Sequence, residues 1–427
     1  MRFDALGGSR MKTVQRSLVS LSVLFACNTL AAGFQVAEHS ASGLGRAFSG
    51  EGAVADNASV LARNPAAMTL FDTAQFSGAL SIVDPEVDIT QTKINDNDFN
   101  QTSNDVAPMQ FVPAAYYISP INDSWAWGIG MFTAYGVATD YPDDIFAGDL
   151  AGDTSLVSVN LNPSIAYRLN ESFSIGAGLN LVYAEAELNR HKGSLPLSGS
   201  ASDKLISMTG ETFAFGWNVG GLYELDENNR FGIGYRSAVD LDFDDGEFTD
   251  YYGGIISDPS KSQTTGRLEI SLPSILELSA FHQLNDQWAV HYGWQLTNWS
   301  TFEELKATSP DCNGGVCFLK EEHYDDNQRW SVGGTYTINT EWTIRAGLAY
   351  DEQAGEATLS IPDSDRYWYS AGLTYTVSEN MTLDAAFALV QSKSGSFTET
   401  DAAGQKLTFE SEAVAYLSAI QLNYTFN

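Results

Sequence analysis

Apolar side chains occupy every second position along several stretches of the chain. The alternation is clearest over residues 173–183, 288–297, 342–350 and 367–377, where the intervening positions are mostly small or polar. Because successive side chains of a strand point to opposite faces, each stretch is predicted to be a strand with one apolar face. The runs extend for about 9–11 residues, the length of a tilted strand that crosses a bilayer, whereas strands in soluble sheets are usually about 5–6 residues long.

The connections between the predicted strands are short and long in strict alternation. The short turns lie at residues 120–123, 169–171, 225–229, 284–286, 338–340 and 377–380, and the long connections at about 91–107, 142–153, 191–211, 243–263, 308–325, 351–364 and 393–408. Six short and seven long connections separate fourteen strands, an even number with the loop asymmetry of outer-membrane barrels. Aromatic pairs near the strand ends, such as Trp288 and Trp294, match the girdles of such barrels. We therefore predict an all-β fold, a closed 14-stranded antiparallel transmembrane β-barrel over residues 73–427.

Residues 32–72 show no alternation and precede the first predicted strand. Glycines interrupt the first half of this segment, and residues 56–61 followed by Arg63-Asn64-Pro65-Ala66 predict short helical turns with a proline stop. Fourteen strands enclose an interior too wide for wall side chains alone to fill. The segment is also too apolar for a solvated periplasmic tail. We therefore expect a partly helical hatch that plugs the lumen.

The N-terminus has the features of an export signal. A short basic stretch precedes an apolar core at residues 18–27, and small residues follow, which is the order of a secretory signal peptide. We place cleavage after Ala31, so that residues 1–31 are removed, and Met11 is an alternative start. Lipoprotein processing at Cys27 is the weaker alternative, because the recognition box before it is a poor match.

Two cysteines of the predicted mature chain, Cys312 and Cys317, are separated by four residues. In an exported protein such a pair is expected to form a disulfide that closes a small loop. A metal site is the weaker interpretation, because no cluster of histidines or carboxylates flanks the pair. We therefore expect neither a metal nor a cofactor.

The chain has 22 Lys and Arg against 54 Asp and Glu, a formal net charge of −32 at pH 7. This balance argues against nucleic acid and anionic lipid as partners. Acidic loops such as residues 240–250 are expected to be solvated, and contact with lipopolysaccharide through divalent cations is an alternative. An enzyme is not expected, since the five histidines form no spaced motif and no Gly-x-Ser-x-Gly elbow is present.

Several motifs occur in an order that is specific to one family. The mature start Ala32-Gly33-Phe34-Gln35 is followed by a glycine-rich stretch at residues 42–53 and by Arg63-Asn64-Pro65-Ala66. Further motifs lie at residues 135–139, 215–220, 361–368 and 409–412. Together they resemble the FadL family of outer-membrane fatty-acid transporters, and the resemblance covers essentially the whole mature chain.

The resemblance implies a route for the ligand. Capture in an apolar groove between the third and fourth outer loops is followed by transfer to an inner pocket and by sideways exit at a kinked third strand. The kink corresponds to Tyr135-Gly136, where glycine weakens strand pairing and permits a bulge. Phe34 corresponds to an aromatic residue that enters the ligand pocket from the hatch, so its movement would empty the pocket. Asn64-Pro65-Ala66 is expected to support the hatch.

The family's inner pocket also contains basic side chains that hold the ligand carboxylate. The matching positions are Arg190 and Lys320. Arg190 shares its phase with Ser174 and Asn180, which parity places in the lumen. Lys320 is instead in phase with the outward Trp330, unless a bulge or loop intervenes. A cation in a semi-apolar pocket would favour a carboxylate through a charge-assisted hydrogen bond.

We therefore expect uptake of long-chain fatty acids by diffusion across the outer membrane of a Gram-negative cell, with aromatic hydrocarbons or other small hydrophobic compounds as the alternative ligands. A hydrophilic porin is disfavoured by the hatch. Expected partners are the ligand, outer-membrane lipid, lipopolysaccharide and the barrel-assembly machinery, and the expected state is a monomer. Two features depart from the family. The third outer loop, residues 191–211, is short, and Asn427 follows the terminal Phe426.

Overall fold

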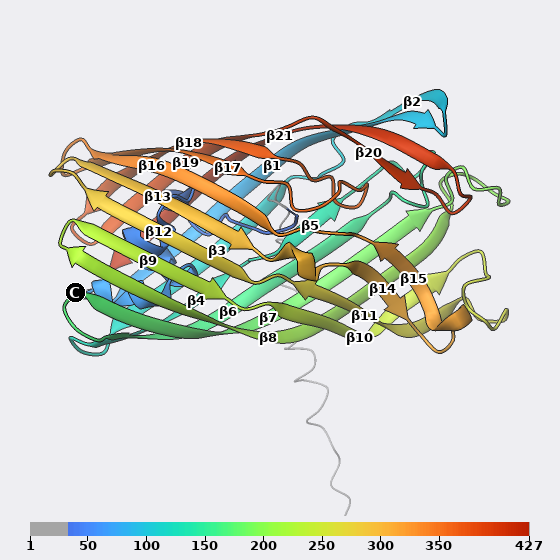
Figure 1. Ribbon diagram of the computed structural model, residues 1–427. Helices are drawn as coiled ribbons and strands as arrows, with labels where there is room; N and C mark the ends of the chain where they lie inside the picture. Colours follow the sequence, from blue (N-terminus) through green and yellow to red (C-terminus); the bar gives the residue numbers. More distant parts are fainter. Residues whose placement is uncertain (1–32, 427) are drawn as a thin grey trace, which may run out of the picture.

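The computed structural model describes residues 33–426, and one closed β-sheet dominates it (Figure 1). The predicted signal peptide, residues 1–31, and the lipidation alternative at Cys27 lie outside this range. Twenty-one strands form the sheet among the described residues. Most of them build the barrel wall, and the remainder extend the sheet at one end.

Seventeen of the labelled strands build the barrel wall. Three wall strands are interrupted, and each of these consists of two labelled strands. The uninterrupted ones are β1 (Gln75–Ile94), β3 (Gln110–Pro120), β6 (Thr154–Arg168), β7 (Phe173–His191), β8 (Lys204–Asp226), β13 (Trp288–Thr297), β16 (Asn327–Thr337), β17 (Trp342–Asp351), β18 (Arg366–Ser378), β19 (Met381–Ser392) and β21 (Lys406–Thr425). The interrupted ones are β4 (Trp125–Phe132) with β5 (Gly136–Thr139), β9 (Asn229–Arg236) with β10 (Val239–Asp250), and β11 (Gln263–Leu272) with β12 (Ile275–Gln283).

Each wall strand pairs antiparallel with its neighbour in the sequence, and the last strand, β21, pairs with β1. The wall is therefore a closed antiparallel barrel of fourteen strands, which confirms the predicted fold. Closure removes the open edge that would leave backbone groups without partners in lipid.

The four other strands lie beyond the wall at its outer end. β2 (Asn97–Ser103) pairs with β1, and β20 (Gly395–Thr400) pairs with β21. β14 (Glu304–Thr308) and β15 (Val316–Glu321) form a hairpin that pairs with β11. A disulfide between Cys312 and Cys317, with an S–S distance of 2.06 Å, closes the tip of this hairpin. β7 and β8 also continue into the expected third outer loop, so only residues 192–203 connect them.

The outward face of the wall is apolar, as the alternation predicts. On β8 the side chains of Phe213, Phe215 and Trp217 are 70%, 74% and 48% exposed, whereas Ala214 and Asn218 between and after them are buried. So large an exposed apolar surface is unfavourable in water, but it suits the hydrocarbon core of a membrane. Residues of the inward face are small or polar, which leaves room for a plug.

The N-terminal residues 33–71, for which we keep the name hatch, fill the inside of the barrel (Figure 1). The short helices are α2 (Ala41–Leu44), α3 (Glu51–Val54), η1 (Ala58–Ala62), η2 (Pro65–Leu70), and, outside the hatch, η3 (Trp299–Thr301) and η4 (Asn313–Gly315). α2 contacts β18, β19 and β21, α3 contacts β9 and β12, and η2 contacts β6, β7 and β8, so the hatch reaches the wall on several sides. Among residues 33–426, no helix combines the length and the apolar character needed to span a bilayer.

Close packing between hatch and wall depends on glycine. A Cβ atom built on Gly45 of the hatch would lie 2.7 Å from the Cα atom of Gly372 on β18. No side chain fits there, since real Cβ atoms do not approach a backbone atom so closely. Glycine at both positions therefore lets the two backbones touch.

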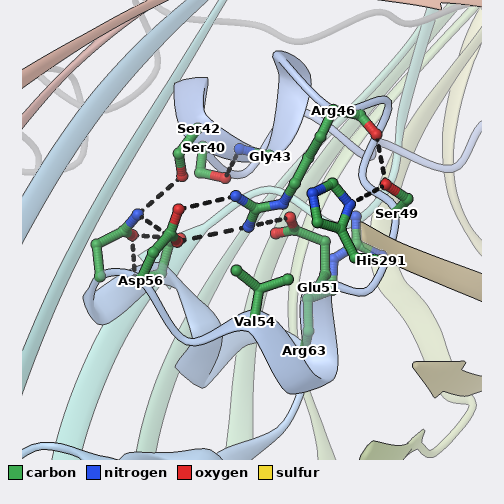
Figure 2. Close-up of polar contacts among 12 residues, drawn as sticks. Ser40, Ser42, Gly43, Arg46, Ser49, Glu51, Val54, Asp56, Arg63 and His291 are labelled. Atoms are coloured by element: carbon green, nitrogen blue, oxygen red, sulfur yellow. Dashed lines mark hydrogen bonds and ion pairs between the residues drawn. The ribbon is translucent and has the colours of Figure 1, made fainter. Parts of the chain in front are cut away.

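An ionic network centred on the buried Arg46 holds the hatch together (Figure 2). Arg46 Nη2 lies 2.7 Å from Glu51 Oε1, and Arg46 Nη1 lies 2.8 Å from Asp56 Oδ2. Asp56 also pairs with Arg345 of β17 at 3.2 Å, which ties the hatch to the wall. Burial alone would raise the pKa of Asp56, but the charges of Arg46 and Arg345 hold it well below its ordinary value. His291 of β13 completes the link through Ser49 Oγ at 2.7 Å.

Candidate functional site

An apolar pocket lies in the outer half of the barrel, next to the tip of the hatch. Its lining is contributed by β5 to β8, β10, β11, the β14–β15 hairpin and the connection after β17, and it includes Phe34, Leu156, Leu188, Met208, Phe243, Phe248, Phe302, Leu305, Phe318 and Ile361. Nearly all of the lining surface is carbon. A pocket of this kind binds a hydrocarbon through the hydrophobic effect and offers few polar partners.

Phe34 enters this pocket from the N-terminal end of the hatch. Its ring lies 4.5 Å from the ring of Trp299 and 5.2 Å from that of Phe302, centroid to centroid, and both contacts are edge-to-face. The backbone before it is anchored as well, because Gly33 N donates to Asp363 Oδ2 at 3.0 Å. The ring therefore occupies space that a ligand would use.

We expect Phe34→Ala to loosen the end of the hatch. The substitution removes a buried ring and its aromatic contacts, which costs about 3–5 kcal/mol in a rigid core and less where the segment can relax. In detergent-solubilised protein, residues 33–36 should become accessible to protease, and a bound fluorescent acyl ligand should dissociate faster in stopped-flow displacement. Phe213→Ala, which removes a ring on the outward face, should change neither measurement. Unchanged dissociation in Phe34→Ala would contradict a gating role.

Two basic side chains meet beside the apolar pocket. Arg190 at the end of β7 and Lys320 on β15 both donate to the hydroxyl of Ser360, from Nη2 at 2.8 Å and from Nζ at 2.9 Å. Arg190 also donates to Thr154 Oγ1 at 3.2 Å. Thr154 and Ile361, the neighbour of Ser360, line the pocket, so the cations stand at its margin. Two positive charges thus converge on one neutral oxygen.

Lys320 and Arg190 differ in the charge of the groups around them. Lys320 Nζ lies 3.4 Å from Glu399 Oε2 and 3.7 Å from Glu322 Oε1. The hydrogen bonds of Arg190 go instead to neutral oxygens, namely the hydroxyls of Thr154 and Ser360 and two backbone carbonyls. A guanidinium that is buried and contacts only neutral acceptors would gain from a carboxylate in its place.

The third wall strand is broken where the kink is expected. β4 ends at Phe132 and β5 begins at Gly136, and the residues between them turn toward the hatch. Val36 N donates to the Ala134 carbonyl at 2.8 Å, and Gly136 N donates to the Phe34 carbonyl at 2.9 Å. The broken strand therefore hydrogen-bonds to the N-terminal end of the hatch.

The break changes the pairing of the wall. β4 pairs with both β3 and β6, and its ladder with β3 ends at Ala115↔Met131. Beyond the break β5 continues the pairing with β6. The hydrogen-bond ladder between β3 and the third wall strand is thus shorter than the ladders around it, which makes this the weakest seam in the side of the barrel.

Residues 22–426 match the family described as "Outer membrane protein transport protein (OMPP1/FadL/TodX)". The chain belongs to this family. A long-chain fatty acid transport protein of Escherichia coli strain K12 is 37% identical over 96% of this chain and 98% of its own. Outer membrane protein P1 of Haemophilus influenzae is 38% identical, over 97% of this chain and 100% of its own. The FadL family is one of outer-membrane proteins, so this barrel is located in the outer membrane.

Solved structures show the same barrel. A FadL homologue of Pseudomonas aeruginosa superimposes with a TM-score of 0.83 at 20% identity, covering 93% of this chain and 100% of its own. The toluene transporter TodX of Pseudomonas putida superimposes with a TM-score of 0.65 at 17% identity, covering 87% of this chain and 94% of its own. At such identities the likeness establishes the fold.

The exception allowed for Lys320 applies in this FadL-family chain, because a connection separates it from β16. Trp330 and Val332 on β16 do face outward, with 40% and 49% of their surface exposed. Lys320, however, belongs to the β14–β15 hairpin, and residues 322–326 separate it from β16. His323 has a positive φ of 47° in that connection, so the alternation of β16 does not carry through. Lys320 consequently points inward to Ser360.

The motif Asn64-Pro65-Ala66 supports the fold of the FadL-type hatch. Asn64 Nδ2 donates to the carbonyl oxygens of Gly52 at 2.8 Å and of Gly221 at 3.0 Å, and its Oδ1 accepts from Ala66 N at 3.1 Å. Asn64 thus caps η2, with Pro65 at the first helical position. The motif lies below the apolar pocket and lines none of it.

Three residues near the apolar pocket of this FadL-family barrel are not predicted from the sequence. Ser360 joins the two cations, Thr154 binds Arg190, and Trp299 packs on Phe34. Ser360 directly precedes the motif at residues 361–368, which is the one available signal. Thr154 and Trp299 carry no signal, because their partners are more than thirty residues away in the sequence.

A pH dependence is expected for the hatch of this FadL-family protein. Glu38 is fully buried, and burial raises its pKa from 4.5 to about 7, although Arg329 and Arg63 oppose the shift. The folded hatch therefore keeps a proton that the unfolded segment releases, and its stability should fall as pH rises from about 4.5 to about 8, by at most about 3 kcal/mol. Limited proteolysis of the hatch should be faster at pH 8 than at pH 5.5.

The variant Glu38→Gln is the control, because its amide does not titrate. It should make hatch proteolysis depend less on pH over the same range than in the parent. A parent protein whose hatch is cleaved equally fast at both pH values would contradict the assignment.

Proposed function

We propose that this protein takes up long-chain fatty acids across the outer membrane by diffusion. The main observation behind this proposal is that Arg190 and Lys320 both donate to Ser360 at the margin of an apolar pocket. This arrangement suits an amphiphile with a long hydrocarbon tail and an anionic head. Relatives named long-chain fatty acid transport proteins support the proposal.

In the proposed mechanism the carboxylate takes the place of the Ser360 hydroxyl between the two cations. Arg190 gains a charged acceptor in place of a neutral one, and charge-assisted hydrogen bonds are roughly twice as strong as neutral ones. The acyl chain lies in the apolar pocket, at about 0.8 kcal/mol per buried methylene. Entry of the chain requires that Phe34 move, so ligand binding and the position of the hatch tip are coupled.

Exit would follow the weak seam beside the broken strand. Phe34 and Gly136 are hydrogen-bonded neighbours, so displacement of the hatch tip also releases β5. The ladder between β3 and the third wall strand already ends at Ala115↔Met131. A hydrophobic ligand that leaves sideways at this level enters lipid directly, which is favourable for an acyl chain. No energy input is needed, since the gradient drives the movement.

We further propose a monomer that sits in outer-membrane lipid and lipopolysaccharide and is inserted by the barrel-assembly machinery. The closed wall has no free edge that a second copy would complete. An acyl-transport role needs no catalysis, and the family is one of transport proteins.

Uptake by cells with and without the gene tests the function. Cells that lack other fatty-acid transporters should accumulate labelled oleate when they express this protein, and labelled toluene should enter at a rate that does not depend on it. Expression without oleate uptake would refute the proposal.

Aromatic hydrocarbons are the second candidate ligands. The pocket lining contains several phenylalanine rings, including Phe34, Phe243, Phe248 and Phe302, and rings of this kind also accommodate small aromatic molecules. Such ligands have no carboxylate that Arg190 or Lys320 could bind. Gene-dependent uptake of toluene without that of oleate would favour this candidate.

A further inference from the structure

A second cavity lies inside the barrel, separated from the apolar pocket by the end of the hatch. Phe34 lines the apolar pocket, whereas the next residues, Gln35 and Val36, line the second cavity. The hydrogen bonds between this stretch and residues 134–136 form the partition. Polar side chains make up a larger share of the lining of the second cavity than of the first, and they include His39, Arg63, Asn218, Arg236 and Glu277.

Arg236 carries a buried positive charge on this cavity. It lies at the end of β9, and only 9% of its surface is exposed. Nη1 donates to Asn180 Oδ1 at 2.5 Å, and Nη2 donates to the Ala62 carbonyl at 2.6 Å. Its guanidinium also lies over the ring of Phe132, 5.0 Å from the centroid. Among residues 33–426, therefore, its direct partners are neutral.

The cavity also has buried donors that the protein leaves without acceptors. Among residues 33–426, Asn218 Nδ2 and Arg63 Nε have no hydrogen-bond partner, although both atoms are shielded from solvent. Glu277, a carboxylate of the lining, is already engaged with Arg63 Nη1 at 3.3 Å and with Ser279 Oγ at 2.9 Å. A buried donor without an acceptor is unfavourable. The cavity thus presents donors and positive charge to whatever enters it.

We infer that this cavity is a second station for the ligand carboxylate, with Arg236 and Asn218 as its donors. The inference rests on the proposed function and assigns the next step of the route. A carboxylate that left Arg190 for an apolar interior would lose every polar partner, which is strongly unfavourable. A second set of donors just beyond the Phe34 partition binds the head group while the acyl chain moves past the hatch tip.

A charge-selective effect on uptake tests the inference. Two ligands with the same hydrocarbon chain serve as probes, oleate with a carboxylate and oleyl alcohol without charge. In cells that express full-length Arg236→Gln, initial oleate uptake should fall about tenfold, whereas uptake of oleyl alcohol should stay within about twofold of the parent. Equilibrium oleate binding to the purified protein should stay close to the parent value, because the Arg190 site is intact.

Two further variants separate a binding role from a structural one. Arg236→Lys keeps the charge and should recover most of the oleate uptake. Arg168→Gln is the matched control, because Arg168 also faces the lumen and donates to a hatch carbonyl, that of Thr69 at 2.9 Å, but it is paired with Glu224 at 2.7 Å. It should not distinguish oleate from oleyl alcohol.

The outcomes are distinct from failure of the proposed function. If the parent takes up no oleate, the proposed function fails. If the parent takes up oleate and Arg236→Gln lowers both probes equally, Arg236 only holds the hatch, and the second station is refuted. Unchanged uptake of oleate in Arg236→Gln refutes it as well.

Discussion

Arg190→Ala is expected to weaken oleate binding by roughly 10- to 100-fold. A hydrogen bond to a charged group contributes about 1.5–3 kcal/mol, which corresponds to that range of affinity. Arg190 is 1% exposed, and its hydrogen bonds within residues 33–426 all go to neutral oxygens, so solvent does not replace the lost interaction. Binding can be followed by displacement of a fluorescent fatty acid from the purified protein.

A suitable control for this experiment is Arg267→Ala. Arg267 lines the same pocket, but its side chain is about half exposed and pairs with Asp242, Asp244 and Glu269. Its charge is already neutralised, so oleate affinity should change less than about threefold. Equal oleate binding by Arg190→Ala and the parent would show that Arg190 does not bind the carboxylate.

Arg46→Met is expected to unfold the hatch and open the lumen. The variant leaves the buried Glu51 without its cation, whereas Asp56 keeps Arg345. Breaking a buried ion pair from one side costs about 3–5 kcal/mol. That is a large fraction of the stability of a segment of about forty residues. Planar-bilayer recordings should show a conductance that the parent lacks, and cells should admit hydrophilic dyes.

The wall should survive the same substitution. The fourteen-stranded barrel is held by its own hydrogen-bond ladders, so Arg46→Met should still insert and resist unfolding in detergent. Arg168→Met, which breaks an ion pair that is about one-fifth exposed, should leave the conductance of the parent unchanged. A closed Arg46→Met channel would mean that packing alone keeps the hatch folded.

The barrel could be predicted because its signal is local. Alternation along residues 288–297 determines which side chains face outward, and Trp288 and Tyr292 are indeed exposed while His291 is buried. The two classes of connection then give the number of wall strands. Each of these features depends on residues that are close in the sequence, so no long-range contact has to be known.

The site is less predictable because it joins distant segments. Lys320 lies on a hairpin outside the wall, and alternation along β16 says nothing about it. Ser360 reaches Arg190 across 170 positions of the chain, and no pattern in the sequence pairs the two. The partition between the cavities likewise depends on hydrogen bonds between residues 34–36 and 134–136. Only the three-dimensional structure shows that Phe34 lines one cavity and Gln35 lines the other.

The pairing of β1 with β21 sets the order in which the molecule can assemble. The ladder runs from Gln75↔Thr425 to Ile94↔Leu407, so the cylinder stays open until the last residues of the chain have been delivered. The hatch precedes β1 but packs through α2 on β18 and β19. α3 and η2 pack on earlier strands, namely β6 to β9 and β12, whereas the partners of α2 are made last, so docking of the hatch is complete only with the final hairpin. We conclude that the hatch is enclosed as the barrel closes, because afterwards its roughly forty residues would have to pass into a barrel that is already closed.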